Sequence, residues 1–100
     1  MIIVLGSAKV KLGQVDAALA LSLTHVHRSR GEAGCISHDV SVDGENPLHL
    51  MFTERWADMP ALLTHFSLEA SKGFVADLTP MLSEAPEMKI YSADEVNVGG

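Results

Sequence analysis

The sequence predicts an α+β fold: a four-stranded antiparallel sheet with two helices on one face. The chain has 100 residues, of which 47% are apolar, so it can bury one core, and a single domain over residues 1–100 is expected. Strand-like and helix-like hydrophobic patterns follow one another in the order strand, helix, strand, strand, helix, strand. That order is typical of a split βαβ arrangement.

The first strand and helix come from the first 30 residues. Branched aliphatic residues, followed by alternation, predict a strand from about Ile2 to Val10. After Gly13, a stripe with helical spacing predicts an amphipathic helix. The residues of this stripe are Val15, Ala18, Leu19, Ser22 and Val26. The helix is expected to end in a cationic turn before Gly31, as the helix dipole favours.

A hairpin is predicted next, over residues 35–52. Apolar and polar residues alternate on both sides of Asp43-Gly44, a pair that favours a tight turn, and Pro47 lengthens the loop. The strand that follows the turn carries Leu48, Leu50 and Phe52 on one face.

The rest of the chain is expected to be helical until a last short strand. Asp58 is a good N-cap with Pro60 in the first turn, and Leu62 and Phe66 then lie on the inner side. A second helical piece, from about Ser67 to Leu82, places Phe74, Leu78 and Met81 or Leu82 inward, with Gly73 and Pro80 as weak points. Residues 87–93 close the sheet, and residues 97–100 are expected to be a loose end.

Two helices cover only one face of such a sheet. The first strand has Ile2 and Val4 on one side and Ile3 and Leu5 on the other, so both faces require cover. The simplest cover for the open face is a second copy of the sheet, which predicts a homodimer with a large apolar interface.

Composition excludes several classes of partner. Thirteen acidic against seven basic residues give a net charge of −6, which disfavours nucleic acid and anionic membranes. No apolar run approaches the roughly 20 residues of a membrane-spanning helix. Cys35 is the sole cysteine, and no secretion signal is evident, so a cytoplasmic protein is expected.

No motif predicts a nucleotide or metal site. His25 and His27 point about 200° apart on a helix, so they are expected at the surface or rim. On a regular strand Cys35 and His38 face opposite ways, which argues against a nucleophile pair and makes Cys35 a small buried hydrophobe. His38 and His49 could meet across the hairpin as two metal ligands, but polar neighbours at the dimer face are the favoured interpretation.

The segment 52–66 holds the candidate chemistry. Strand alternation puts Phe52, Glu54 and Trp56 on one face, where a carboxylate must either pair with a lysine or arginine or line a cavity. Trp56 is either a core residue or part of a pocket with an N–H to donate. His65, at the border of the helical stripe, either exchanges protons with a ligand or is a half-exposed residue at a helix end.

These residues resemble a known family. The segments EAGC (32–35), ENP (45–47), the F-x-E-x-W strand (52–56), the D-x-x-A-L-x-x-H helix start (58–65) and Phe74 are similar, in order and spacing, to the antibiotic biosynthesis monooxygenase family. The family's small dimeric ferredoxin-like proteins include cofactor-free quinol and anthrone oxygenases. The resemblance implies an apolar substrate cavity between the sheet and the second helical region.

Two departures bear on the reaction. Haem-degrading relatives carry an asparagine where this chain aligns Ala8, which argues against haem cleavage. Many quinol-oxidising relatives have a second histidine where this chain has Ala70.

The expected function is a monooxygenase that needs no cofactor and oxidises an electron-rich aromatic, such as a hydroquinone or anthrone, with O₂. His65 would transfer a proton, Trp56 would form a wall and donate an N–H, and Glu54 would orient a partner or act as a reserve base. The apolar lining would comprise Phe52, Leu62, Phe66 and Phe74. The alternatives are an isomerase of a small carbonyl compound, with His65 and Glu54 as acid and base, and a dimeric binding protein without catalysis.

Overall fold

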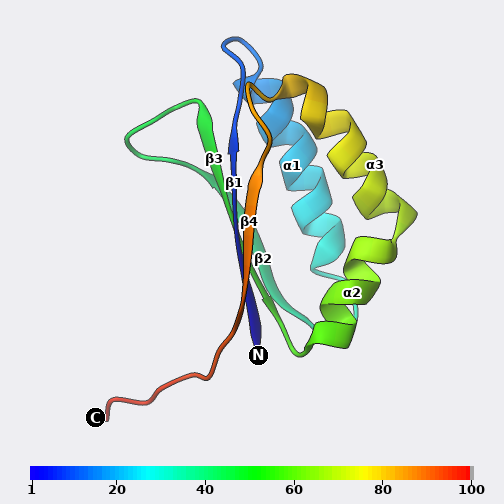
Figure 1. Cartoon of the computed structure of the whole chain (residues 1–100), viewed down its shortest axis with the longest axis vertical. Helices are drawn as coiled ribbons and strands as arrows, with labels where there is room; N and C mark the ends of the chain where they lie inside the picture. Colours follow the sequence, from blue (N-terminus) through cyan, green and yellow to red (C-terminus); the bar gives the residue numbers. More distant parts are fainter. Residues whose placement is uncertain (100) are drawn as a thin grey trace.

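The computed structural model describes residues 1–99 and shows a sheet with all helices on one side (Figure 1). Its elements are β1 (Ile2–Lys9), α1 (Val15–Ser29), β2 (Cys35–Val42), β3 (His49–Trp56), α2 (Met59–Ser67), α3 (Glu69–Leu78), the 3₁₀ turn η1 (Thr79–Met81) and β4 (Glu87–Ser92). The sheet is antiparallel in the order β2-β3-β1-β4. This is the ferredoxin-like α+β fold that the order of sequence patterns predicts.

The strand register decides which side chains face the helices. In β1, Ile2, Val4 and Ala8 are buried, and they align with Trp56, Glu54 and Leu50 of β3. Because side chains alternate along a strand, Phe52 shares this helix-facing side. The alternation predicted for the strand that carries Glu54 and Trp56 is therefore confirmed.

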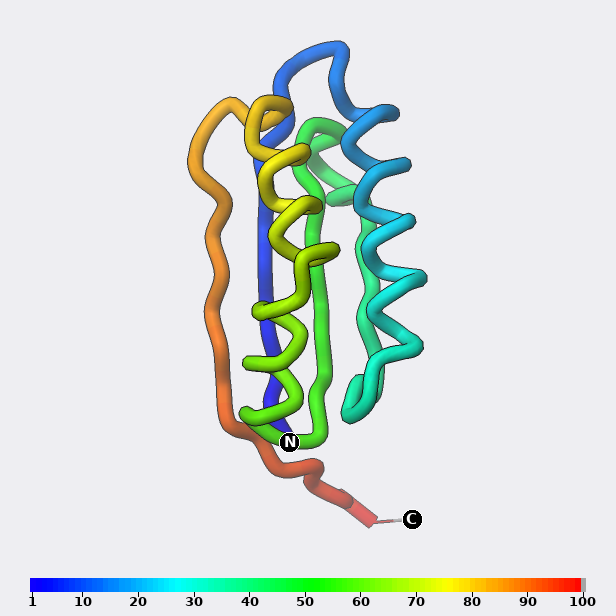
Figure 2. The backbone as a smooth tube through the Cα atoms, turned by 90° about the vertical axis from the view of Figure 1, so that its right-hand side faces the viewer, coloured from blue at the N-terminus to red at the C-terminus, as the bar shows by residue number. Residues whose placement is uncertain are grey.

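The helices cover the sheet unevenly. Seen from the helix side, α1 lies in front of β2, and α2 and α3 lie in front of the middle strands, while β4 at the edge has no helix in front of it (Figure 2). All six residues of β4 are exposed. The sheet thus has one uncovered edge on its helix side.

Local sequence explains the start of α2. Asp58 has an extended backbone, and its carboxylate accepts a hydrogen bond from the Ala61 amide at 2.9 Å. This is the side-chain cap that the sequence predicts. The two predicted helical pieces meet at Leu68, whose ψ of 138° separates α2 from α3. The second piece is helical through Gly73 and ends at Leu78, and Pro80, a predicted weak point, lies in the 3₁₀ turn that follows.

Two hydrophobic clusters form the core. One lies where β1 and β3 meet α1 and α3, and consists of Ala8, Val10, Ala18, Leu50, Leu78 and Leu82. The other, at the opposite end, consists of Ile2, Val4, Trp56 and Leu62. The polar groups described below lie along the same helix-facing side of the sheet.

Two details of the hairpin differ from the prediction. Gly44 does not have a positive φ, so Asp43-Gly44 does not form the expected two-residue turn. Residues 43–48 form a loop instead, in which the Asp43 carboxylate accepts from the Glu45 amide. The register also shifts between Cys35 and Ser37.

This shift moves His38 relative to Cys35. Cys35 aligns with Trp56 and His38 with Glu54, so both belong to the helix-facing side, and the expectation that they face opposite ways is wrong. A bulge inserts one residue and thereby reverses the alternation of side chains.

The opposite face of the sheet carries exposed apolar side chains. Leu5, Met51 and Tyr91 are 47%, 39% and 46% exposed. In residues 1–99 no helix has the length and hydropathy to span a bilayer. Residues 93–99 follow β4 without helix or strand (Figure 1), and the last residue of the predicted loose end, Gly100, lies outside the described residues.

Candidate active site

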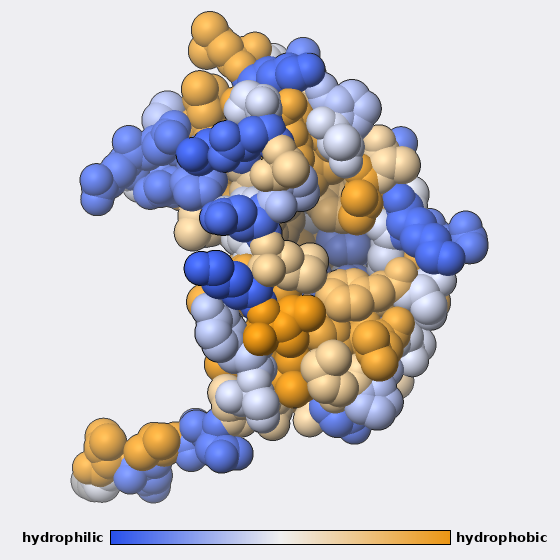
Figure 3. All heavy atoms as spheres, viewed as in Figure 1, coloured by the Kyte–Doolittle hydropathy of each residue, from blue (hydrophilic) through white to orange (hydrophobic). Residues whose placement is uncertain are grey.

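A cavity of about 430 Å³ lies between the sheet and α3. Aromatic and aliphatic side chains from β3, α2 and α3 line most of it, and Pro86, Glu87 and Met88 border it on the uncovered side. Figure 3 shows the hollow beside α3 and β4 with a largely hydrophobic border. The volume is in the range of small-molecule pockets.

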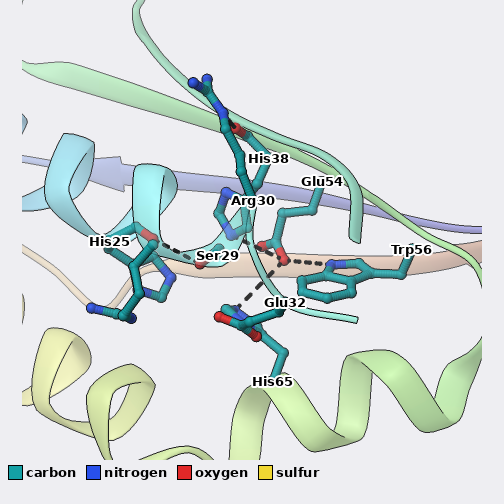
Figure 4. A network of polar contacts seen from close by, with 9 residues as sticks. His25, Ser29, Arg30, Glu32, His38, Glu54, Trp56 and His65 are labelled. Atoms are coloured by element: carbon teal, nitrogen blue, oxygen red, sulfur yellow. Dashed lines mark hydrogen bonds and ion pairs between the residues drawn. The ribbon is translucent and has the colours of Figure 1, made fainter. Parts of the chain in front are cut away.

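Glu54 brings a carboxylate into this apolar setting. Its side chain is 5% exposed and lines the cavity. Its Oε1 accepts a hydrogen bond from the Trp56 indole N–H at 2.9 Å, and the same oxygen lies 3.3 Å from Nε2 of His38 (Figure 4). The alternative of an ion pair with a lysine or arginine is wrong for Glu54, since in residues 1–99 its charged partners are histidines.

His65 is also buried, at 3% exposed, and it lines the same cavity. The ring is held from its far side, where Nδ1 lies 2.8 Å from a carboxylate oxygen of Glu32. Nε2 points to Glu54, whose Oε1 is 4.0 Å away (Figure 4). The alternative of a half-exposed histidine at a helix end is therefore wrong, and Glu32, which sequence reasoning did not assign to the site, fixes the orientation of the ring.

His25 is part of the site, although the sequence analysis placed it at the surface. It is 5% exposed, lines the cavity and stacks on Phe74 with ring centroids 4.0 Å apart. The spacing to Ser22 and Ala18 on the predicted inner stripe of α1 would have shown this, because residues three and seven apart share a helix face. His27, on the other side of the helix, is exposed as expected.

His38 is the second histidine that the sequence analysis misplaced. It is 1% exposed on the helix side of β2 and lines the cavity, so it does not lie on the outer face of the sheet. His49 is next to Lys9 in the register and 3.2 Å from Asp43. The two histidines therefore do not meet across the hairpin.

The other predicted site residues divide into two groups. Phe52, Phe66 and Phe74 line the cavity. Trp56 and Leu62 are fully buried in the cluster behind it and are not among the lining residues. Trp56 contacts the site through Glu54 and through the His65 ring, whose centroid is 4.7 Å from that of the indole.

The surroundings lower the pKa of both Glu54 and His25, which favours the charged form of Glu54 and the neutral form of His25. Burial raises the pKa of Glu54, but the contacts with His38, Trp56 and His65 outweigh it, so the pKa lies below its usual value and the carboxylate is ionised. Burial, together with the neighbouring His38, His65 and Arg28, lowers the pKa of His25 to about 3. At neutral pH the cavity therefore holds an anion beside a neutral imidazole.

Comparison with known proteins assigns the class. The family model of antibiotic biosynthesis monooxygenases matches residues 1–77. A crystal structure of an antibiotic biosynthesis monooxygenase has a TM-score of 0.87 and 26% identity, covering 95% of this chain and all of that one. This chain belongs to the antibiotic biosynthesis monooxygenase family.

Individual relatives extend this comparison. A Deinococcus radiodurans protein, provisionally named a member of the same family, has a TM-score of 0.92 and 25% identity over the full length of both chains. A conserved protein of Methanosarcina mazei Go1 has a TM-score of 0.88 and 28% identity over 93% of this chain and 92% of its own. The uncharacterized protein sll1783 of Synechocystis is 35% identical over 94% of this chain, which spans 64% of its length.

Proposed function

We propose that this protein is a monooxygenase that oxidises an electron-rich aromatic compound, of the hydroquinone or anthrone type, with O₂ and without a cofactor. The observation that carries the proposal is one cavity with aromatic walls, at the end of which a positioned imidazole and an ionised carboxylate lie side by side. The family and the names of its structural relatives support the same reaction class.

The reaction needs a base and a water-poor cavity. For an anthrone, removal of a proton from the ring CH₂ gives a carbanion that transfers one electron to O₂. The two radicals combine to form a C–O bond, and the resulting hydroperoxide loses water to leave a ketone. One oxygen atom ends in the product and the other in water, and the substrate supplies all the electrons, so no external reductant is required.

His65 fits the role of base. With Nδ1–H donated to Glu32, the ring presents the Nε2 lone pair to the cavity. Protonation of Nε2 would then be stabilised by the Glu54 carboxylate 4.0 Å away. Glu54 is held in place by the Trp56 indole N–H, so we assign Trp56 to positioning this carboxylate and not to a wall of the pocket.

The aromatic lining fits a planar apolar substrate better than a phosphorylated one. An isomerase of a phosphorylated compound would need a cation in the cavity, and the candidates from the sequence are Lys9, Arg28, Arg30, Arg55 and Lys72. Of these only Lys72 borders the cavity, and its ammonium lies 3.8 Å from Glu69. Glu54 and Glu87 line the same space and would repel an anion. A protein whose histidines and tryptophan only pack in a filled core would lack such a cavity. A binding protein without catalysis would have one, and the oxygen-uptake test below distinguishes it from an oxygenase.

We also propose that a second copy of the chain covers the open face of the sheet. Leu5, Met51 and Tyr91 expose apolar surface there, and in a monomer this surface would remain in water. Sedimentation equilibrium of the wild type and of Leu5→Glu tests this: a dimer that the charged variant disrupts is expected, and a monomeric wild type contradicts it.

Oxygen uptake is the direct test of the reaction. EDTA-treated, flavin-free protein is mixed with reduced naphthoquinols and anthrones in an oxygen electrode, with autoxidation subtracted. We expect saturable uptake that His65→Ala lowers by about a hundredfold or more, while His49→Ala, a histidine on the hairpin away from the cavity, retains the wild-type rate. Uptake no faster than autoxidation for every substrate, or an unchanged rate in His65→Ala, contradicts the proposal.

A further inference from the structure

Three buried histidines from three different elements surround one point. His25 of α1, His38 of β2 and His65 of α2 each offer a ring nitrogen, and these nitrogens all lie within 4.8 Å of one another. The ring centroids are 5.2 Å apart from His25 to His38, 5.2 Å from His25 to His65 and 5.5 Å from His38 to His65. The three rings thus form a nearly equilateral triangle at the end of the cavity.

Within residues 1–99 the ring nitrogens of His38 have no hydrogen-bond partner. Its Nε2 lies 3.3 Å from the Glu54 carboxylate without the alignment of a hydrogen bond, and its Nδ1 also has no partner. Buried polar atoms are nearly always paired, and this side chain is 1% exposed. The ring therefore has only the charge contact with Glu54, and its nitrogens remain available to a ligand.

The charge around the triangle favours a cation. Glu54 is in contact with His38 and Trp56, and Glu32 with His65, while one Glu32 oxygen is buried without a partner. In residues 1–99 neither carboxylate pairs with a lysine or arginine. Two exposed arginines contact the cluster from outside: the Arg28 guanidinium contacts Nδ1 of His25, and Arg30 donates to the backbone carbonyl of His38 and pairs with Asp39.

We propose that His25, His38 and His65 bind a divalent transition-metal ion of the Zn²⁺ type, with the Glu54 carboxylate beside them as a fourth ligand. Imidazole nitrogens are ligands for Zn²⁺ and similar ions, whereas Mg²⁺ and Ca²⁺ are bound by oxygen ligands. A carboxylate oxygen can complete a zinc site built from histidines. Zn–N distances of about 2.0–2.1 Å place neighbouring nitrogens about 3.3 Å apart. Binding therefore shortens each nitrogen–nitrogen distance by about 1.5 Å at most. Side-chain rotations beside an open cavity can supply this change.

Two neighbours set how the ligands are presented. The Glu32 contact keeps the proton of His65 on Nδ1 and leaves Nε2 free for a metal, which is the usual arrangement of a carboxylate behind a metal-binding histidine. Arg28 acts in the opposite sense, because its guanidinium donates to His25 Nδ1 and so favours a proton on Nε2. Metal binding displaces this exposed side chain, and the structure assigns Arg28 as a residue that weakens the site.

A bound ion would occupy the nitrogen that the proposed oxygenase uses as a base. This consequence rests on the proposed function: Zn²⁺ would inhibit oxygen uptake, and EDTA would restore it. The binding itself does not depend on that activity, so it is measured without substrate.

The experiment is a calorimetric titration of untagged, EDTA-treated and desalted protein with ZnCl₂. We expect one Zn²⁺ per chain, and Co²⁺ in its place should give the visible absorption bands of a tetrahedral site. His25→Gln and His38→Gln should each weaken binding by about tenfold or more, as should Glu32→Gln. Arg28→Leu should tighten it.

The chain supplies its own controls in the two histidines outside the cluster. The double variant His27→Gln/His49→Gln should bind Zn²⁺ as the wild type does, and circular dichroism of each variant checks that it is folded. Absence of saturable binding in the wild type overturns the proposal. So does equal weakening in the control variant, which would indicate a surface site, or unchanged affinity in folded His25→Gln and His38→Gln.

Inhibition of oxygen uptake by Zn²⁺ tests whether His65 is both metal ligand and base. If Zn²⁺ binds at the cluster and an active enzyme is not inhibited, then His65 Nε2 is not both ligand and base, and the combined assignment is wrong. If no substrate is oxidised at all, the oxygenase proposal fails while the calorimetric result still decides the metal site.

Discussion

Substitution of Gly34 by alanine should move α2 and the histidine that it carries. Gly34 precedes β2 with φ of +83°, and an added Cβ would lie 2.5 Å from the Cβ of Ala61 in α2. Ala61 is four residues before His65, so the two lie on the same face of the helix. The absent side chain of Gly34 is therefore what lets α2 approach the start of β2.

The cost can be worked out in two parts. A non-glycine residue in the left-handed region costs about 1–2 kcal/mol. The clash adds about 1–3 kcal/mol, as overpacking does in other cores, because two methyl carbons need about 3.5–4.0 Å and α2 must shift by about 1 Å. Gly13→Ala is the matched control, since Gly13 has φ of +85° with nothing within 4 Å of the added Cβ.

Urea unfolding measures both variants against the wild type at one protein concentration, with the fluorescence of Trp56 as the probe. We expect Gly34→Ala to lose about 1–3 kcal/mol more unfolding free energy than Gly13→Ala. It should also lose oxygen uptake, because α2 carries His65 away from Glu54.

A double-mutant cycle isolates the contact. Ala61→Gly alone should destabilise the protein by about 1 kcal/mol. The double variant with Gly34→Ala should lose less than the sum of the two single losses, by the clash of about 1–3 kcal/mol, because the other methyl group is gone. Equal losses for the two glycine variants, or additive losses in the cycle, would refute the reasoning about the clash.

Two further predictions concern the site. Trp56→Phe removes the N–H that Glu54 accepts, so it should cost about 1.5–3 kcal/mol of unfolding free energy and raise the pKa of Glu54; urea unfolding and NMR titration of the carboxylate check this, and an unchanged Glu54 pKa contradicts it. In the metal-free folded protein the pKa of His25 is about 3, below the ordinary value of 6.5. Between these pH values the unfolded state binds a proton at His25 and the folded state does not, so the free energy of unfolding decreases as the pH falls from 6.5 towards 3. His25→Phe keeps a ring against Phe74 and should make this loss less steep between pH 7 and 4.5 in urea unfolding; parallel pH profiles would count against it.

Sequence patterns were sufficient for the fold because they act over short distances. Alternation placed Glu54 and Trp56 on one side of a strand, and the cap at Asp58 marked the start of α2 independently of the rest of the chain. The same local rules placed His65 beside the apolar stripe of its helix. These interactions span only a few residues, so the sequence contains them directly.

The histidine cluster depends on longer-range geometry. His38 faces Glu54 because the loop at 43–48 and the shift after Cys35 set the register, and neither follows from the Asp43-Gly44 pair. The spacing between His25 and His27 shows only that they point apart, whereas the spacing between His25 and Ala18 places His25 on the inner face of α1. His25 and Ser29 are buried on the same face as the predicted stripe, but they are polar, so hydropathy alone does not assign them to it.

The exposure of β4 has a consequence for what the cavity can admit. β4 is bonded to the sheet through β1 alone and buries none of its side chains, yet Glu87 and Met88 border the cavity. Segments with few buried contacts separate from a fold at a lower free energy than the core, so β4 should open before any other wall. The size of the largest substrate is then set by how easily the hydrogen bonds between β1 and β4 break. The cavity volume of the closed structure is a lower bound on the volume that a substrate can occupy.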